Sequence, residues 1–213
     1  MADTLVLSPS SRVVNDCESK LQRFRDGYMG YSYVSYRPQT PTDRLLPEDL
    51  AVTLAFNSRA TGRAFESLVT HGGKLDLSAL PDKPLANTTA TEREAVASAI
   101  CQMTGWPGFR MSLATKTLHK KRPNLIPVLD NRAMVEAYLR PDWPDVRTAG
   151  QSWWGAQLIR AALDAVHFDL LRQENLDTWK ALAQVDEKMT QIELLDAVWW
   201  VHFRDLEPVR TPS

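Results

Sequence analysis

Cysteine is scarce in this chain, which has only Cys17 and Cys101, each alone in a helix-like context. Two isolated cysteines cannot build a disulfide framework or a four-cysteine zinc or iron–sulfur site. Long apolar runs are also missing, since none approaches the roughly 18 residues that a membrane-spanning helix needs. The first residues, MADTLVLSPSSR, lack the basic start and sustained apolar stretch of a secretory signal. We therefore expect a cytoplasmic protein with no membrane partner and no iron–sulfur cluster.

The sequence also lacks an excess of charge of either sign. Its 25 basic and 26 acidic residues give a net charge of −1, so no global attraction to nucleic acid is expected. The segment 116–122 is nevertheless locally basic, with Lys116, His119, Lys120, Lys121 and Arg122 and no carboxylate. These charges predict one basic face, although they also suit a solvated helix end beside its negative carbonyl groups.

Fixed-period repeats and low-complexity tracts are absent, and every long periodic segment has a helical period, which predicts an all-α fold. With 213 residues, 44% of them hydrophobic, the chain is expected to form one functional unit with a single core or two lobes. Threonine and glutamate three residues apart predict capping boxes at Thr91–Glu94 and Thr190–Glu193. Helices are expected at 11–25, from Pro47 to about 57, at 63–69, from Thr91, and at 131–139, 153–172, 175–183 and 190–203.

The most informative segment, 101–118, predicts a helix, a tight turn and a second amphipathic helix. Gly105 and Gly108 can adopt positive φ and bring bare backbone close to a ligand, while the first amides of the second helix can meet a phosphate. Lys116 and Lys120, four residues apart, share a face that can follow the phosphates. An ordinary interhelical loop uses glycine for the same steric reasons, so the turn alone favours neither interpretation.

Over residues 91–139 the chain resembles the helix-hairpin-helix superfamily of base-excision DNA glycosylases, whose hairpin reads roughly Leu-Pro-Gly-small-Gly-x-x-x-Ala. Here Trp106-Pro107-Gly108-Phe109-Arg110 is followed by Ala114. Trp106 replaces the leading leucine, and Arg110 replaces the second glycine. The resemblance implies that 105–110, together with Lys116 and Lys120, binds double-stranded DNA. It implies no required cofactor, although a monovalent cation at the hairpin is a family property that Arg110 would alter.

In that superfamily a catalytic aspartate follows the hairpin and opens a helix, and Asp130 stands at the matching place. Ser112 stands where bifunctional members carry a lysine, and 130 − 112 = 18 residues is the separation expected between the two positions. A carboxylate under the deoxyribose stabilises the positive charge that develops as the glycosidic bond breaks. Without the lysine no Schiff base forms, so the resemblance implies a monofunctional glycosylase that leaves an abasic site. Asp130 also suits the N-cap of the following helix, and the two roles are compatible.

A flipped base needs apolar or aromatic support, and the chain has several candidates. They are Tyr28, Tyr31, Tyr33 and Tyr36 near the amino terminus, Trp106 on the hairpin, and Trp153 and Trp154 beyond the aspartate. No oxoguanine or adenine pocket is recognisable. Some small members that this chain resembles excise glucosylated cytosines in antiphage defence, so glucosylated hydroxymethylcytosine in phage DNA is the expected substrate. The tyrosines equally suit an extended segment pinned to the body, and Trp179, Trp199 and Trp200 are expected to pack in the core.

The resemblance implies two lobes with a cleft between them, one of about 43–122 and one of 1–42 with 123–213, in a monomer with Asp130 at the cleft. His119, His167 and His202 have no metal-ligand spacing, and Asp164, Asp169 and Glu174 are expected on a solvated helix face. Two other functions stay open. One is a non-catalytic DNA-binding protein in which Asp130 is only a cap, and the other is a protein-interaction module that uses the tryptophan-rich carboxyl-terminal helix.

Overall fold

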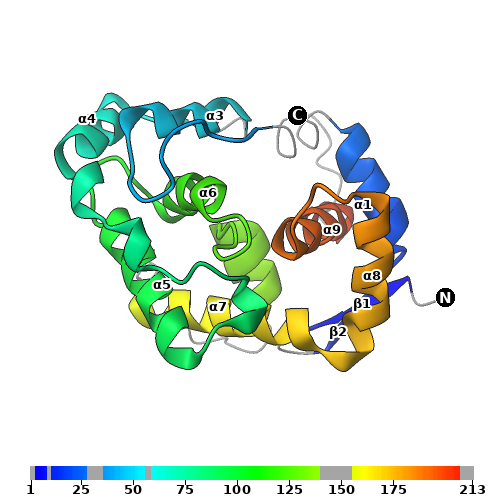
Figure 1. The fold of residues 1–213 in the computed structure, drawn as a ribbon. Coiled ribbons are helices and arrows are strands. Elements are labelled where there is room, and N and C mark those ends of the chain that lie inside the picture. The colour runs from blue at the N-terminus through cyan, green and yellow to red at the C-terminus, as the bar shows by residue number, and fades with distance from the viewer. Residues whose placement is uncertain (1–2, 9–10, 28–35, 56–58, 140–154, 207–213) are drawn as a thin grey trace.

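The computed structural model describes residues 3–8, 11–27, 36–55, 59–139 and 155–206, with the side chains of 55, 131, 132, 135 and 136 left aside (Figure 1). The fold is mostly helical with one short β-hairpin. The α-helices are α1 (Cys17–Asp26), α3 (Val52–Ala55), α4 (Gly62–His71), α5 (Ala90–Thr104), α6 (Met111–Lys121), α7 (Ala156–Leu171), α8 (Leu176–Val185) and α9 (Gln191–Leu206). Short 3-10 turns cover Pro47–Ala51, Gly72–Lys74, Leu77–Ala79, Leu85–Asn87 and Gln173–Asn175, and a π-helix covers Asn131–Leu139.

The mostly helical fold agrees with the all-α expectation apart from one small β-hairpin, in which strands β1 (Thr4–Leu7) and β2 (Arg12–Asn15) pair antiparallel. Residues 11–15 were expected to begin a helix, and that prediction was wrong. Leu5 lies opposite Val14, and both side chains are buried, while β-branched residues favour the extended backbone. The first helix starts only at Cys17.

Helix α5 begins at Ala90, one residue earlier than predicted, and the box predicted at Thr91–Glu94 was wrong because the actual box lies two residues earlier. Its capping box is formed by Thr89 and Glu92: the Glu92 amide donates to Thr89 Oγ1 at 3.3 Å, and the Thr89 amide donates to Glu92 Oε2 at 2.7 Å. Glu94 instead pairs with Arg160 of α7. The second predicted box is confirmed, because the Glu193 amide donates to Thr190 Oγ1 at 3.2 Å.

One continuous hydrophobic cluster runs through the described residues and includes side chains from both predicted lobes. In Figure 1, α6 and α9 lie in the middle of the view, α3 to α5 on one side, α1, α8 and the β-hairpin on the other, and α7 along the bottom. Trp199 of α9 is 1% exposed, and its indole nitrogen donates to the carbonyl of Ala133 at 2.8 Å. Trp179 is also buried, which confirms that these two tryptophans pack in the core.

Asp169 was expected on a solvated helix face, and that prediction was wrong because the residue is fully buried. The Ser8 amide donates to both of its carboxylate oxygens, at 2.8 and 2.9 Å, and the hydroxyl of Tyr138 donates to one of them. Burial raises the pKa of Asp169, and these hydrogen bonds oppose that rise. The network joins the β-hairpin, the π-helix and α7.

Helix α7 is also joined to α5 through charged side chains. Asp164 accepts from Arg160 at 2.9 Å and from Arg93 at 2.5 Å, so it belongs to an ion-pair network.

In the part of the chain that the structure describes, no helix combines the length and apolar character that crossing a membrane requires.

Candidate functional site

The turn between α5 and α6 is anchored by its two aromatic residues. Trp106 and Phe109 are buried, and their ring centroids lie 6.0 Å apart in an edge-to-face arrangement. The ring centroid of Trp106 also lies 5.7 Å from that of His71 in α4, with the two rings tilted. The prediction that these two side chains contact DNA is therefore corrected, since they fill the space between the turn and α4. Gly105, Pro107, Gly108 and Arg110 remain exposed.

Gly108 has the positive φ that the sequence predicts, at 85°, whereas Gly105 has an ordinary helical φ of −76°. A Cβ atom at Gly108 would lie 2.4 Å from the amide nitrogen of Ala64, at the start of α4. The close backbone approach is thus to the protein's own helix. Ser67 of α4 reinforces it by donating from its hydroxyl to the Pro107 carbonyl at 2.7 Å.

The amino-terminal end of α6 keeps the property that a phosphate site needs. Arg110 is the N-cap residue, and no side-chain cap bond to the helix is present among the residues that the structure describes. The first turn of α6 carries no acidic residue, and Ser112 there is half-buried. The first amides of a helix without a side-chain cap, beside an exposed arginine, are of the kind that can bind an anion.

Asp130 lies beside α6 because the chain that precedes it is tied to this helix. The hydroxyl of Thr115 accepts from the Leu129 amide at 3.0 Å, and His119 Nδ1 lies 2.6 Å from the Ile126 carbonyl. Asp130 is half-buried, and its Oδ1 accepts from the Ala133 amide at 2.7 Å. The carboxylate therefore caps the π-helix, as the sequence predicts.

Lys116 of α6 lies near two carboxylates. Burial lowers the pKa of this half-buried lysine, and the charges of Asp196 on α9 and of Asp130 oppose that shift. Asp196 follows Glu193 by three residues, so both carboxylates share one face of α9. Sequence reasoning missed Asp196, although its helical spacing from Glu193 could have indicated it.

Lys120 was expected to follow the DNA phosphates, and the structure corrects this because the residue is 4% exposed. Its Nζ lies 2.8 Å from Glu193 Oε1, and Arg37 and His119 reach the same carboxylate. Burial lowers the pKa of Lys120 to about 8 against the attraction of Glu193. Burial alone would raise the pKa of Glu193, but His119 and Lys120 outweigh it and hold that pKa well below its usual range.

Lys121, the neighbour of Lys120, is also buried, but its side chain points away from α9 and toward the chain around Thr40. Its Nζ lies 2.8 Å from Asp49 Oδ1 and donates to Thr40 Oγ1 at 2.5 Å and to the Pro41 carbonyl at 2.6 Å. The predicted basic face is thus replaced by internal ion pairs that connect α6 to α9 and to the chain around Thr40.

Of the aromatic candidates for the base pocket, Tyr36 lies within the described residues, half-buried against the core. Burial, followed by the charge of Asp49, raises its pKa. Tyr28, Tyr31, Tyr33, Trp153 and Trp154 lie outside the described residues.

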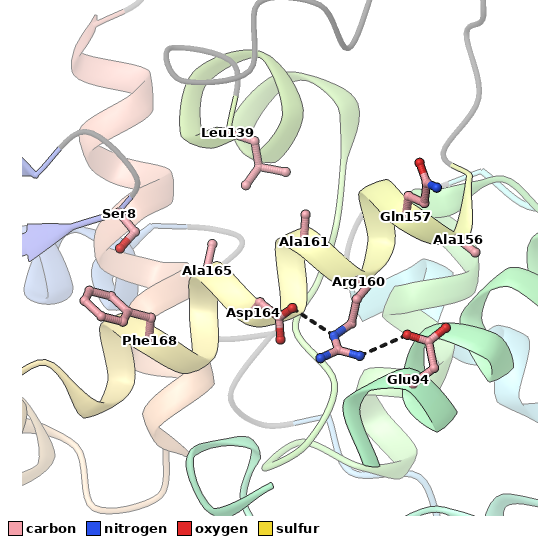
Figure 2. Close-up of a pocket in the computed structure, with 10 residues that line it drawn as sticks. All are labelled: Ser8, Glu94, Leu139, Ala156, Gln157, Arg160, Ala161, Asp164, Ala165 and Phe168. Carbon is pink, nitrogen blue, oxygen red and sulfur yellow. Dashed lines mark hydrogen bonds and ion pairs between the residues drawn. The ribbon is translucent and has the colours of Figure 1, made fainter. Parts of the chain in front are cut away.

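A cavity of about 660 Å³ lies along α7 and is in the size range of ligand pockets, and Figure 2 shows the residues that line it. Leu139, Ala161 and Phe168 supply apolar walls. The charged groups along it are paired with one another, because Arg160 donates to Glu94 Oε2 and Asp164 Oδ2, each at 2.9 Å. None of the predicted hairpin residues lines this cavity.

The fold and site together define a mostly helical protein with an exposed hairpin turn and an aspartate held beside the second hairpin helix. A family model matches residues 18–203, so the chain belongs to DUF6308, described as a family of unknown function. Comparison with curated proteins and with solved structures finds no match.

Proposed function

We propose that this protein is a DNA glycosylase that hydrolyses the N-glycosidic bond of a modified base flipped out of duplex DNA. The position of Asp130 carries the proposal. Its half-buried carboxylate starts a helical segment and is held beside the hairpin helix through Leu129 and Thr115. The proposed architecture is the two-lobed helix-hairpin-helix glycosylase fold, acting as a monomer.

In the proposed reaction, Asp130 acts on the sugar of the flipped nucleotide. As the bond between C1′ and the base breaks, positive charge develops on the deoxyribose, and a nearby carboxylate stabilises it. The base leaves with the bonding electron pair and takes a proton from solvent. The same carboxylate orients the water that adds to C1′ and accepts its proton, leaving an abasic site. The charge of Asp130 also acts on Lys116 of α6, so this carboxylate and the hairpin helix interact electrostatically as well as through Thr115.

DNA would contact the exposed side of the turn and the uncapped start of α6. Gly105, Pro107, Gly108 and Arg110 face solvent there, and the helix amides lack a side-chain partner among the described residues. Such contacts hold the backbone without reading sequence. The basic end of α6 has no part in this proposal, because Lys120 and Lys121 are buried in ion pairs.

The decisive comparison is Asp130→Asn against Asp130→Ala. Asparagine is as good an N-cap as aspartate, so the Asn variant keeps the bond to Ala133 and loses the negative charge. We expect it to fold normally and to lose base release by a factor of about 100 or more, the range of effects for a single electrostatic group. Full activity in the folded Asn variant would remove Asp130 from the mechanism.

The substrate is proposed to be glucosylated hydroxymethylcytosine in phage DNA. Purified protein would be incubated with phage genomes that carry modified or unmodified cytosine, and abasic sites would be counted. Because Ser112 cannot form a Schiff base, borohydride should trap no covalent adduct with the product. Abasic sites in neither genome would contradict this substrate, and a trapped adduct would contradict the monofunctional mechanism.

A non-catalytic DNA-binding protein is the second candidate, and the bond from Ala133 to Asp130 favours it, since a cap alone explains the residue. That protein would bind any duplex in a salt-sensitive way and release no base. The same abasic-site assay, run beside a duplex-binding measurement, separates the two functions.

A further inference from the structure

A second cavity, of about 330 Å³, lies at the carboxyl-terminal end of α6. Its polar lining comes from Thr42, Asp82, Lys83, Lys121, Arg122 and Asn124. Backbone hydrogen bonds hold the surrounding segments together, with the Leu85 amide 2.8 Å from the Asn124 carbonyl and the Leu77 amide 2.9 Å from the Asp43 carbonyl. The cavity is therefore bounded by fixed backbone and not by free loops alone.

The three cations at this cavity differ in how their charge is compensated. Lys121 is neutralised by Asp49 at 2.8 Å, and Lys83 pairs at 2.8 Å with Glu92 while its side chain stays 37% exposed. Among the described residues, the acceptors of Arg122 are two carbonyls, the Leu77 oxygen at 3.1 Å and the Lys121 oxygen at 3.4 Å. Within the described part of the chain no carboxylate pairs with Arg122, and its Nε is buried without an acceptor.

An arginine with these properties has unused binding capacity. Its guanidinium has five N–H groups in a planar fork that matches two oxygens of a phosphate or carboxylate. A buried donor without an acceptor costs free energy, which an anion that draws the guanidinium into the cavity would relieve. Capping of α6 explains the bond from Arg122 to the Lys121 carbonyl, and the other bond goes to Leu77 outside that helix. Neither bond satisfies the Nε.

We infer that this cavity binds a small oxyanion, a phosphate group, through the guanidinium of Arg122 with Lys83 at its edge. The volume is at the lower end of the range for ligand pockets, which suits a phosphate monoester. Exposed Asp82 also faces this cavity and would repel the anion, so it weakens binding. Asp130 does not line this cavity, so the phosphate site does not rest on the proposed glycosylase function. The phosphate could be supplied by the DNA backbone or by a free phosphate ester, and the experiment below distinguishes the two sources.

Isothermal titration with inorganic phosphate, against chloride at equal ionic strength, tests the site. We expect Arg122→Gln to weaken phosphate binding about tenfold or more, and Arg122→Lys to weaken it less, because it keeps the charge and loses the fork. Asp82→Asn should strengthen binding about threefold by removing a like charge. Lys180→Gln is the matched control, since it removes one positive charge from an exposed position on α8 and should change nothing.

Melting temperatures without phosphate show whether each variant is folded, and the Lys variant keeps the test valid if the Gln variant is not. No phosphate-specific heat with the wild-type protein, or unchanged affinity in folded Arg122 variants, would overturn the site. A short duplex identifies the source of the phosphate: competition with inorganic phosphate indicates the DNA backbone, and independent binding indicates a free phosphate ester. Loss of base release in Asp130→Asn leaves this result unaffected, so the two proposals fail separately.

Discussion

The two ends of helix α6 contrast with each other. At the amino-terminal end, Gly108 and Arg110 are exposed and the helix amides have no side-chain cap among the described residues. At the carboxyl-terminal end, Lys120 and Lys121 are buried against Glu193 and Asp49. The amino-terminal end, which has few charged residues, is therefore exposed to solvent. At the carboxyl-terminal end, the two lysines form ion pairs inside the protein.

This difference shows that a run of basic residues is not by itself a surface for nucleic acid. Consecutive lysines on a helix point in different directions, about 100° apart, so each meets a different neighbour. Here one neighbour is α9 and the other is the chain around Thr40. The basic segment therefore organises the packing around α6, and the anion sites that we propose for this helix use its first backbone amides and Arg122 instead of these lysines.

The largest expected effect comes from Glu193→Ala, which leaves buried Lys120 and His119 without their carboxylate. Removing one partner of a buried ion pair costs about 3–5 kcal/mol, because the remaining charge stays desolvated. Urea denaturation measures the loss in the free energy of unfolding. Glu187→Ala, at an exposed position, is the control, and a loss below about 1 kcal/mol in the Glu193 variant would show that the buried pair contributes little.

The pH dependence of stability sharpens the same comparison. The pKa of Glu193 is lower in the folded protein than its unfolded value of about 4.5, so the unfolded state binds more protons in acid. The contribution of Glu193 to stability is complete above about pH 4.5 and is lost as the pH falls further. Denaturation at several pH values should show the wild-type advantage over Glu193→Ala shrinking toward pH 2, and a constant difference would argue against a charged Glu193.

Gly108→Ala should destabilise the hairpin end by about 1–3 kcal/mol, because alanine is strained at φ 85° and its Cβ would meet Ala64 of α4. Thermal denaturation measures this change. Gly73→Ala is the matched control, since a Cβ there meets nothing within 4 Å and φ is not in the left-handed range. If both variants melt alike, the turn is not packed on α4 as described.

The smallest effect on stability is expected for Arg110→Gln, within about 0.5 kcal/mol, because the side chain is exposed. Duplex binding should weaken, and the slope of log affinity against log salt should fall by about 1, as for one lost phosphate contact. Fluorescence anisotropy at several salt concentrations measures both, with Lys180→Gln as the charge-matched comparison. An unchanged slope would place the DNA contact elsewhere.

The sequence predicted the local features that depend on nearby residues. The hairpin helices, the box at Thr190 and the cap at Asp130 follow from spacing and side-chain chemistry within a few residues. The burial of Lys120 could not be predicted in this way, because its partner Glu193 lies 73 residues further along the chain. The β-hairpin was missed because two four-residue strands give too short a pattern to distinguish from the start of a helix.

Thr115 has a consequence for motion within the protein. Its hydroxyl donates to the Met111 carbonyl inside α6 and accepts from the amide that immediately precedes Asp130. A movement of α6 is therefore expected to move the carboxylate of Asp130 with it. If a polyanion binds at the amino-terminal end of α6 as we propose, a shift of the helix on binding would also move the acidic group, so binding would help to align it.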